Sequence, residues 1–115
     1  MSTLSFTQLF PTTALTGSAA TIYTAPTTAG TLVKGLRVRF TNTNASTANS
    51  VTLYNIPLAG SAATANAVLS AVSIPANDYL DVDLPVLPAG GFIQAFASTT
   101  LEVNISQISG QIFNA

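Results

Sequence analysis

Short apolar runs of period two, repeatedly broken by turn-forming residues, constrain the fold of this chain more than any other feature of its sequence. Apolar and polar residues alternate within the runs, as they do in strands that bury one face. Glycine, proline, asparagine and Ser-Thr clusters separate the runs and are typical of turns. No stretch has the apolar spacing of an amphipathic helix, so the pattern predicts an all-β domain.

The clearest strand is expected over residues 32–41, where large apolar residues occupy one face and polar residues the other. The two faces are formed by Leu36, Val38 and Phe40 and by Arg37, Arg39 and Thr41, respectively. The same alternation appears over residues 79–84 and 101–106. It then slips, because Ile108 falls on the wrong face, and this predicts a β-bulge near Ser106 and Gln107.

The remaining strands and loops follow from the same pattern. Further strands are expected over residues 20–24, 51–54, 67–74 and 92–97, with a polar loop at 42–50. Residues 60–66 form a loop of small residues, whose alanines could make a helical turn. A chain of 115 residues has the length of one domain. We therefore predict a single antiparallel β-sandwich, of jelly-roll or immunoglobulin-like type, over residues 16–115, with residues 1–15 as an amino-terminal arm or first strand.

Composition excludes most catalytic and cofactor chemistry. Only 6% of the residues are charged, and the chain has no histidine, cysteine or tryptophan. Without histidine nothing obvious activates the many hydroxyls as nucleophiles, and without cysteine there is no disulfide or thiolate metal site. We expect no enzyme, no catalytic residue and no cofactor. With three basic residues and a net charge of −1, we also expect no nucleic-acid partner.

Membrane association and secretion have no support in the sequence either. No stretch approaches the run of about 20 apolar residues that crosses a membrane. Residues 1–15 lack the basic start and long apolar core of a secretory signal.

The acidic residues have a few candidate roles. Asp78, Asp81 and Asp83 match no calcium loop and supply too few oxygens, so we expect no metal site. We also reject glycosidase chemistry at Asp81 and Glu102, for want of an aromatic platform. In so charge-poor a chain, the aspartates are expected to pair with the arginines of residues 32–41. These pairs lie either between strands of one sheet or between subunits, where they would set orientation.

A polar surface that carries almost no charge favours association. Phe6 and Phe10 precede a proline in a segment expected to be extended, and they are either core residues or anchors inserted into a neighbour. An arm over residues 1–15 could add a strand to an adjacent subunit, and deleting residues 2–12 would then abolish assembly while leaving the β-fold intact. The candidate interface residues are Phe6, Phe10, Arg37, Arg39, Asp81 and Asp83.

The loops rich in threonine and asparagine allow another interpretation. Residues 12–18, 41–50 and 61–66 offer hydroxyls and amides that glycans could contact. The same residues also serve as neutral turn formers, which is their commoner role.

A resemblance to known proteins is carried by five segments, which are residues 20–31, 35–44, 72–77, 86–95 and 108–111. Taken in this order, they resemble small β-sandwich virion proteins of tailed bacteriophages, found as head-decoration, cement or minor tail components. The resemblance implies homo-oligomers, often trimers, that dock onto a major capsid or tail protein, and a location in the virion. The function it implies is capsid decoration or cement that stabilises the head by binding capsid subunits. The alternative is a minor tail component or a module that binds carbohydrate or a host surface.

Overall fold

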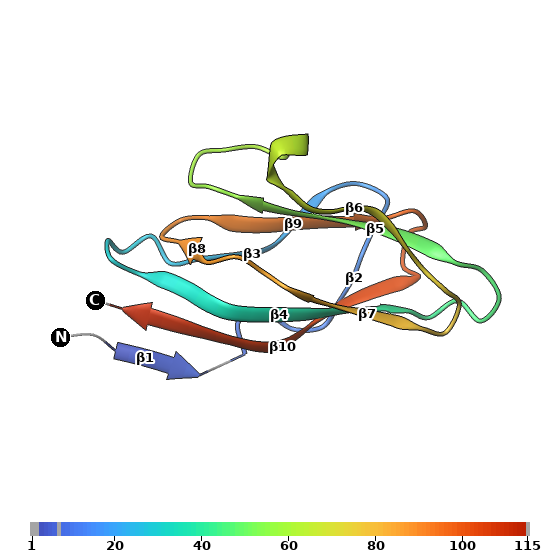
Figure 1. Ribbon diagram of the computed structural model, residues 1–115, viewed down its shortest axis with the longest axis horizontal. Helices are drawn as coiled ribbons and strands as arrows, with labels where there is room; N and C mark the ends of the chain where they lie inside the picture. Colours follow the sequence, from blue (N-terminus) through green and yellow to red (C-terminus); the bar gives the residue numbers. More distant parts are fainter. Residues whose placement is uncertain (1–2, 7, 115) are drawn as a thin grey trace.

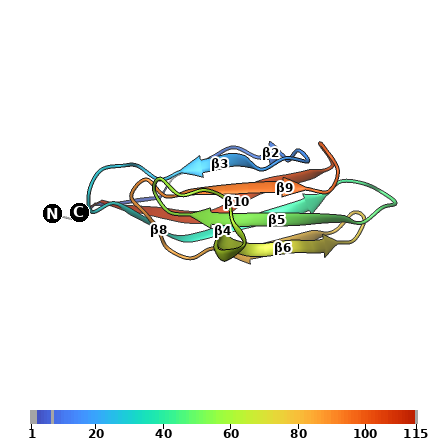
Figure 2. The ribbon, with the colours of Figure 1, turned by 90° about the horizontal axis from the view of Figure 1, so that it is seen from above.

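Two antiparallel sheets lie face to face in the computed structural model, which describes residues 3–6 and 8–114 (Figure 1, Figure 2). The six-stranded sheet has the order β1-β10-β4-β7, with β2 beside β10 and β8 beside β4. Its strands are β1 (Thr3–Phe6), β2 (Thr13–Ala14), β4 (Leu32–Asn42), β7 (Tyr79–Asp83), β8 (Leu87–Pro88) and β10 (Val103–Asn114). The four-stranded sheet has the order β3-β9-β5-β6. Its strands are β3 (Ala20–Thr24), β5 (Asn49–Ile56), β6 (Ala67–Ile74) and β9 (Phe92–Ala97).

The predicted β-sandwich is therefore confirmed. The described residues contain one short helical element, the 3₁₀ turn η1 (Thr64–Asn66), in the loop expected over residues 60–66. Within the described part of the chain, no helix is long and apolar enough to cross a membrane. The molecule measures 51 × 27 × 17 Å, and its strands run along the longest dimension (Figure 1).

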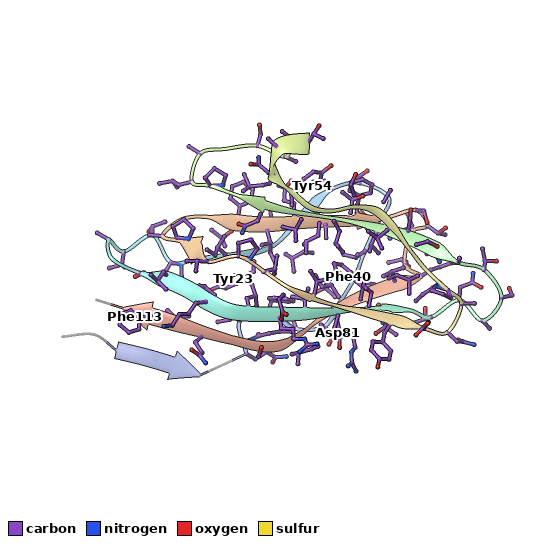
Figure 3. The ribbon with its side chains drawn as sticks, viewed as in Figure 1. Tyr23, Phe40, Tyr54, Asp81 and Phe113 are labelled. Carbon is purple, nitrogen blue, oxygen red and sulfur yellow. The ribbon has the colours of Figure 1, made fainter. Side chains whose placement is uncertain are left out.

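Side chains from both sheets fill the space between them, as Figure 3 shows for Phe40. The apolar face predicted for residues 32–41 is buried. Burying one such side chain is favourable by about 1.5–3 kcal/mol, so this layer supplies most of the force that holds the sheets together. The largest fully buried side chains are Phe40, Leu15, Leu36, Leu53, Ile56, Ile74, Leu87, Ile93, Ile105, Val33, Val38 and Val51.

Two bulges on neighbouring strands cancel each other. The register between β4 and β10 shifts between Gln107 and Ser109, so Ile108 is an extra residue of β10, and the predicted bulge is confirmed one residue further along. A second shift places an extra residue on β4 near Gly35, whose φ of 65° is a left-handed conformation that favours glycine. The two insertions let both ends of these long strands stay paired.

The strand predicted over residues 101–106 begins only at Val103, the first residue of β10. Leu101 lies before this strand, in a turn with φ 64°, and is exposed. The Leu101 amide donates a hydrogen bond to the carbonyl of Leu15, which fixes the turn against the amino-terminal segment. The alternation is correct from Val103 onward, where Val103 and Ile105 are both buried.

The amino-terminal segment lies along the outer edge of β10 in its own chain. Strand β1 pairs with the end of β10, from Thr3 opposite Asn114 to Phe6 opposite Gln111. Nearer the start of β10, β2 pairs with the same edge. Between the two strands, the amide of Leu9 donates to the side-chain oxygen of Gln107. The division of the chain between residues 15 and 16 stays a prediction.

Candidate functional site

The charges of this protein gather on the outer face of the six-stranded sheet. All three basic residues lie on β4, and two of the four acidic residues lie on the neighbouring strand β7. The strands of the four-stranded sheet contain no charged residue. We call this surface the charged face; it consists of Lys34, Arg37, Arg39, Tyr79, Asp81 and Asp83.

Arg39 is held firmly at the centre of the charged face. It lies directly opposite Asp81 in the pairing of β4 with β7. Its Nε donates to Oδ1 of Asp81 at 2.7 Å, and its Nη2 donates to Oδ2 at 3.0 Å. The guanidinium carbon also lies 4.1 Å from the ring centroid of Tyr79, a cation–π contact. Hydrogen bonding to Asp81 raises the pKa of Arg39, and the same bonds lower the pKa of Asp81.

Arg37 is held much less tightly. Its Nη2 lies 3.7 Å from Oδ2 of Asp81, and its Nε lies 3.7 Å from Oδ1 of Asp83. The side chains of Arg37 and Asp83 are 48% and 84% exposed, against 17% for Asp81. Exposed pairs of this kind contribute about 0–1 kcal/mol to stability. Arg37 and Asp83 can therefore separate and pair with charges of a partner at little cost in free energy.

The expected pairing of arginines with aspartates across strands of one sheet is confirmed. Figure 3 shows Asp81 on the outer side of this sheet, away from the core. At the other end of β4, Lys34 completes the face, with its Nζ 5.4 Å from the ring centroid of Phe113. The charged face is thus a row of cations beside a shorter row of carboxylates.

Glu102 belongs to a different cluster and does not pair with Asp81. Its Oε1 accepts hydrogen bonds from Nδ2 of Asn44 at 2.9 Å and from Nδ2 of Asn49 at 3.0 Å. These bonds, that from Asn49 first, lower the pKa of Glu102. Glu102 is thus bound by asparagines, whereas both carboxylate oxygens of Asp81 are bound by Arg39.

Asn42 lies at the centre of this second cluster, fully buried. Its Nδ2 donates to the carbonyls of Thr47, Ile74 and Pro75, and its Oδ1 accepts from the amide of Asn44 and from Nδ2 of Asn49. We call the group the asparagine cluster; it consists of Asn42, Asn44, Asn49, Ser98 and Glu102.

Sequence reasoning missed the asparagine cluster. Its only signal was the density of asparagine in residues 42–49, which was interpreted as turn chemistry or as a source of amides for glycans. Three of those amides are instead used inside the chain. Loop residues elsewhere behave similarly: Nδ2 of Asn66 donates to the carbonyl of Ser61, and Oγ1 of Thr16 donates to that of Ser18.

Of the two phenylalanines proposed as interface anchors, Phe10 lies in the core and not on the charged face. Phe10 is 4% exposed and belongs to the core, with its ring centroid 6.2 Å from that of Tyr23. Burial of Tyr23 in this region raises the pKa of its hydroxyl. The backbone of Phe6 pairs with Gln111, but its side chain lies outside the described residues. The role of all six candidates as interface residues stays a prediction.

Acidic side chains do not gather into a metal site in the described part of the chain. No group of three His, Cys, Asp or Glu residues there is placed to hold an ion. Both carboxylate oxygens of Asp81 are engaged by Arg39, and Oδ1 of Asp78 accepts a hydrogen bond from the amide of Tyr79.

Comparison with known proteins identifies similar folds. No family model matches the sequence, and no curated protein matches it. Among solved structures, a protein of Bacillus endospore appendages, described as disulfide-linked pili, aligns with a TM-score of 0.55 at 11% identity, over 100% of this chain and 90% of that one. A chain of infectious bursal disease virus, Gx strain, aligns with a TM-score of 0.51 at 16% identity, over 98% of this chain and 31% of that one. At these identities the likeness concerns the fold: this β-sandwich is also found in a pilus and in a virus particle.

Proposed function

We propose that this protein is a structural subunit of a virion, specifically a decoration or cement component of a bacteriophage head that associates with copies of itself and with capsid subunits. The observation that carries the proposal is the distribution of charge. The few charges lie mostly on one face, where the arginines pair with the aspartates, and the strands of the four-stranded sheet carry none.

This distribution suits a protein that is covered by neighbours on several sides. Burying an unpaired charge at an interface costs several kcal/mol, whereas neutral hydroxyls and amides are desolvated more cheaply. The loosely paired Arg37 and Asp83 would then give the subunit its orientation on a partner, since charged pairs at the rim of an interface contribute specificity more than affinity.

The two structural neighbours support an assembling role because both belong to large assemblies by name. The endospore appendages are described as disulfide-linked, and the present chain has no cysteine. Disulfide bonds therefore cannot hold an assembly of this protein together. Pairing between strands and contacts between uncharged surfaces can hold subunits together without disulfide bonds.

A second candidate function is a tail or surface module that binds carbohydrate. It is favoured by one observation, the aromatic pair on the outer side of the four-stranded sheet (Figure 3 labels Tyr54). The rings of Tyr54 and Phe96 are 6.3 Å apart, and on the same sheet Nε2 of Gln94 donates to Oγ1 of Thr21. Aromatic faces beside amides and hydroxyls are suited to stacking against sugar rings.

Immunogold labelling separates the structural function from others. Antibodies raised against the recombinant chain would be applied to virus particles and cell fractions of the source organism. We expect gold on the particle head; label confined to the soluble cell fraction would overturn the proposal. A glycan array on the purified protein tests the second candidate, because a cement protein should bind no glycan, and Tyr54→Ala should abolish any binding that depends on the aromatic pair.

A further inference from the structure

The edges of the four-stranded sheet are both disrupted by bulges. Strand β3, at one edge, shifts register against β9 between Thr21 and Tyr23. Strand β6, at the other edge, shifts twice against β5, and Ala71 there has φ 48° with its amide donating to Oγ1 of Thr52. A bulge twists an edge strand and interrupts its row of free hydrogen-bonding groups, which prevents a second sheet from pairing with it.

The β7 edge of the six-stranded sheet is protected differently. Its register with β4 is regular, but Asp81 and Asp83 lie on it and Asp78 directly precedes it. The edge continues past Pro85 into β8, which ends in Pro88. Charges and prolines are the devices with which natural edge strands avoid pairing with other molecules.

Strand β1 is the exception among the outermost described strands. It ends the order β1-β10-β4-β7, so one of its edges is unpaired, and it lies at the lower rim of Figure 1. Its sequence, Thr-Leu-Ser-Phe, contains no charge and no proline, and its register with β10 is regular throughout. None of the devices that block the other edges is present here.

We propose that the free edge of β1 pairs with the free edge of β1 in a second copy of this chain. The partner follows by elimination, because the other outer strands that a second copy offers are bulged, acidic, interrupted by proline or, in the case of β2, only two residues long. Two identical uncharged strands related by a two-fold axis pair in antiparallel fashion and close the contact, so the six-stranded sheets of both copies become continuous. The inference rests on the proposed self-association and names the surface that carries it.

A charge placed on β1 tests the contact. Ser5→Lys puts a like charge on each of the two facing strands and should raise the dissociation constant of the pair more than about tenfold. Ser73→Lys is the matched control, because it adds the same charge to the bulged edge strand β6, where Ser73 is exposed. Light scattering over a range of concentrations should show wild type and Ser73→Lys as pairs and Ser5→Lys as a monomer. A monomeric wild type, or an unchanged Ser5→Lys, would overturn the proposal.

Single cysteines give a second measurement that does not depend on how well Ser5→Lys folds. The chain has no cysteine, so each new thiol is alone. With cysteine placed in turn at Thr3, Leu4, Ser5 and Phe6, mild oxidation should link two chains at one or more positions near the axis, because disulfides need Cα atoms within about 7 Å. Equal rates for all four variants and for Ser73→Cys would contradict the proposal.

Strand exchange between copies is a different arrangement, and a double variant distinguishes it. Ser5 lies opposite Ile112 within the chain, so Ser5→Cys with Ile112→Cys should form a bridge inside one chain. A bridge that joins two chains would show exchanged strands and overturn the edge contact. Immunogold labelling of particles does not depend on β1. Labelled particles together with no cross-link between chains would refute this inference alone. Cross-linked pairs of chains that are absent from particles would refute the proposed function alone.

Discussion

Arg39 and Asp81 face each other across β4 and β7 and share two hydrogen bonds, while the neighbouring pair Arg37 and Asp83 makes only a 3.7 Å contact. The charged face therefore has a rigid centre and an adaptable rim. The centre holds the register of two strands whose other faces lie against the core. The rim leaves one cation and one carboxylate available to a partner.

Removing the central carboxylate should destabilise the fold more than removing the peripheral one. Asp81→Asn removes the negative charge and one of the two oxygens that accept hydrogen bonds from Arg39, whereas Asp83→Asn removes only a long contact of an exposed side chain. Thermal unfolding of the two variants should give a lower Tm for Asp81→Asn and a Tm near that of wild type for Asp83→Asn. The reverse order would show that the pair at the rim, rather than Arg39 with Asp81, stabilises this sheet.

Stability should be flat between about pH 5 and 8 and fall in acid. The chain has no histidine, so no side chain with an ordinary pKa titrates in the neutral range. The pKa values of Asp81 and Glu102 are lowered in the folded state, so their stabilisation is complete above the ordinary carboxyl pKa and is lost as the pH falls through the folded values. Urea unfolding from pH 8 to pH 2.5 should show the loss beginning below about pH 4.

The double variant Asp81→Asn with Glu102→Gln is the control for this pH dependence. It lacks both carboxylates, so its unfolding free energy should change less with acid than that of wild type. An equally steep fall in the double variant would assign the acid sensitivity to other groups.

Replacing Asn42 should be costly although it carries no charge. Asn42→Ala leaves buried carbonyls and the amide of Asn44 without their partner, and one unsatisfied buried group costs about 1–3 kcal/mol. We expect a loss of about 3 kcal/mol in denaturant unfolding. Asn104→Ala removes the same amide from the outer face of β10 and should change stability by less than about 0.5 kcal/mol. Similar losses in both variants would contradict the structural role of the asparagine cluster.

Much of the fold could be predicted because alternation records which face of a strand is buried. It gave the apolar face of β4 and the bulge in β10, where Ile108 breaks the parity. Alternation could not predict the compensating bulge near Gly35, because glycine has no side chain that would show which face of the strand it occupies. The asparagine cluster was also missed, since its hydrogen bonds join segments that are distant in sequence, such as Asn49 with Glu102.

Gly35 should tolerate asparagine better than alanine. Its φ of 65° is a conformation that costs a residue with a Cβ about 1–2 kcal/mol, although a Cβ there would meet no atom within 4 Å. Gly35→Ala should therefore lose about 1 kcal/mol and Gly35→Asn less, because asparagine adopts this conformation more readily. Gly17→Ala is the control, since its new Cβ would make only ordinary contacts and no left-handed φ is involved. Equal losses at both glycines would argue against backbone strain as the cause.

Phe10 joins the amino-terminal segment to the core, and this changes what truncation should do. Phe10→Ala removes a buried ring packed near Tyr23 and should cost about 3–5 kcal/mol. A deletion of residues 2–12 removes the same ring, so we now expect it to weaken the fold as well as any assembly. Deleting residues 2–6 alone keeps Phe10 and the bond from Leu9 to Gln107 and should leave the rest of the sandwich folded. Circular dichroism with thermal unfolding compares the two truncations; a 2–12 deletion as stable as the 2–6 deletion would show that Phe10 does not anchor this segment.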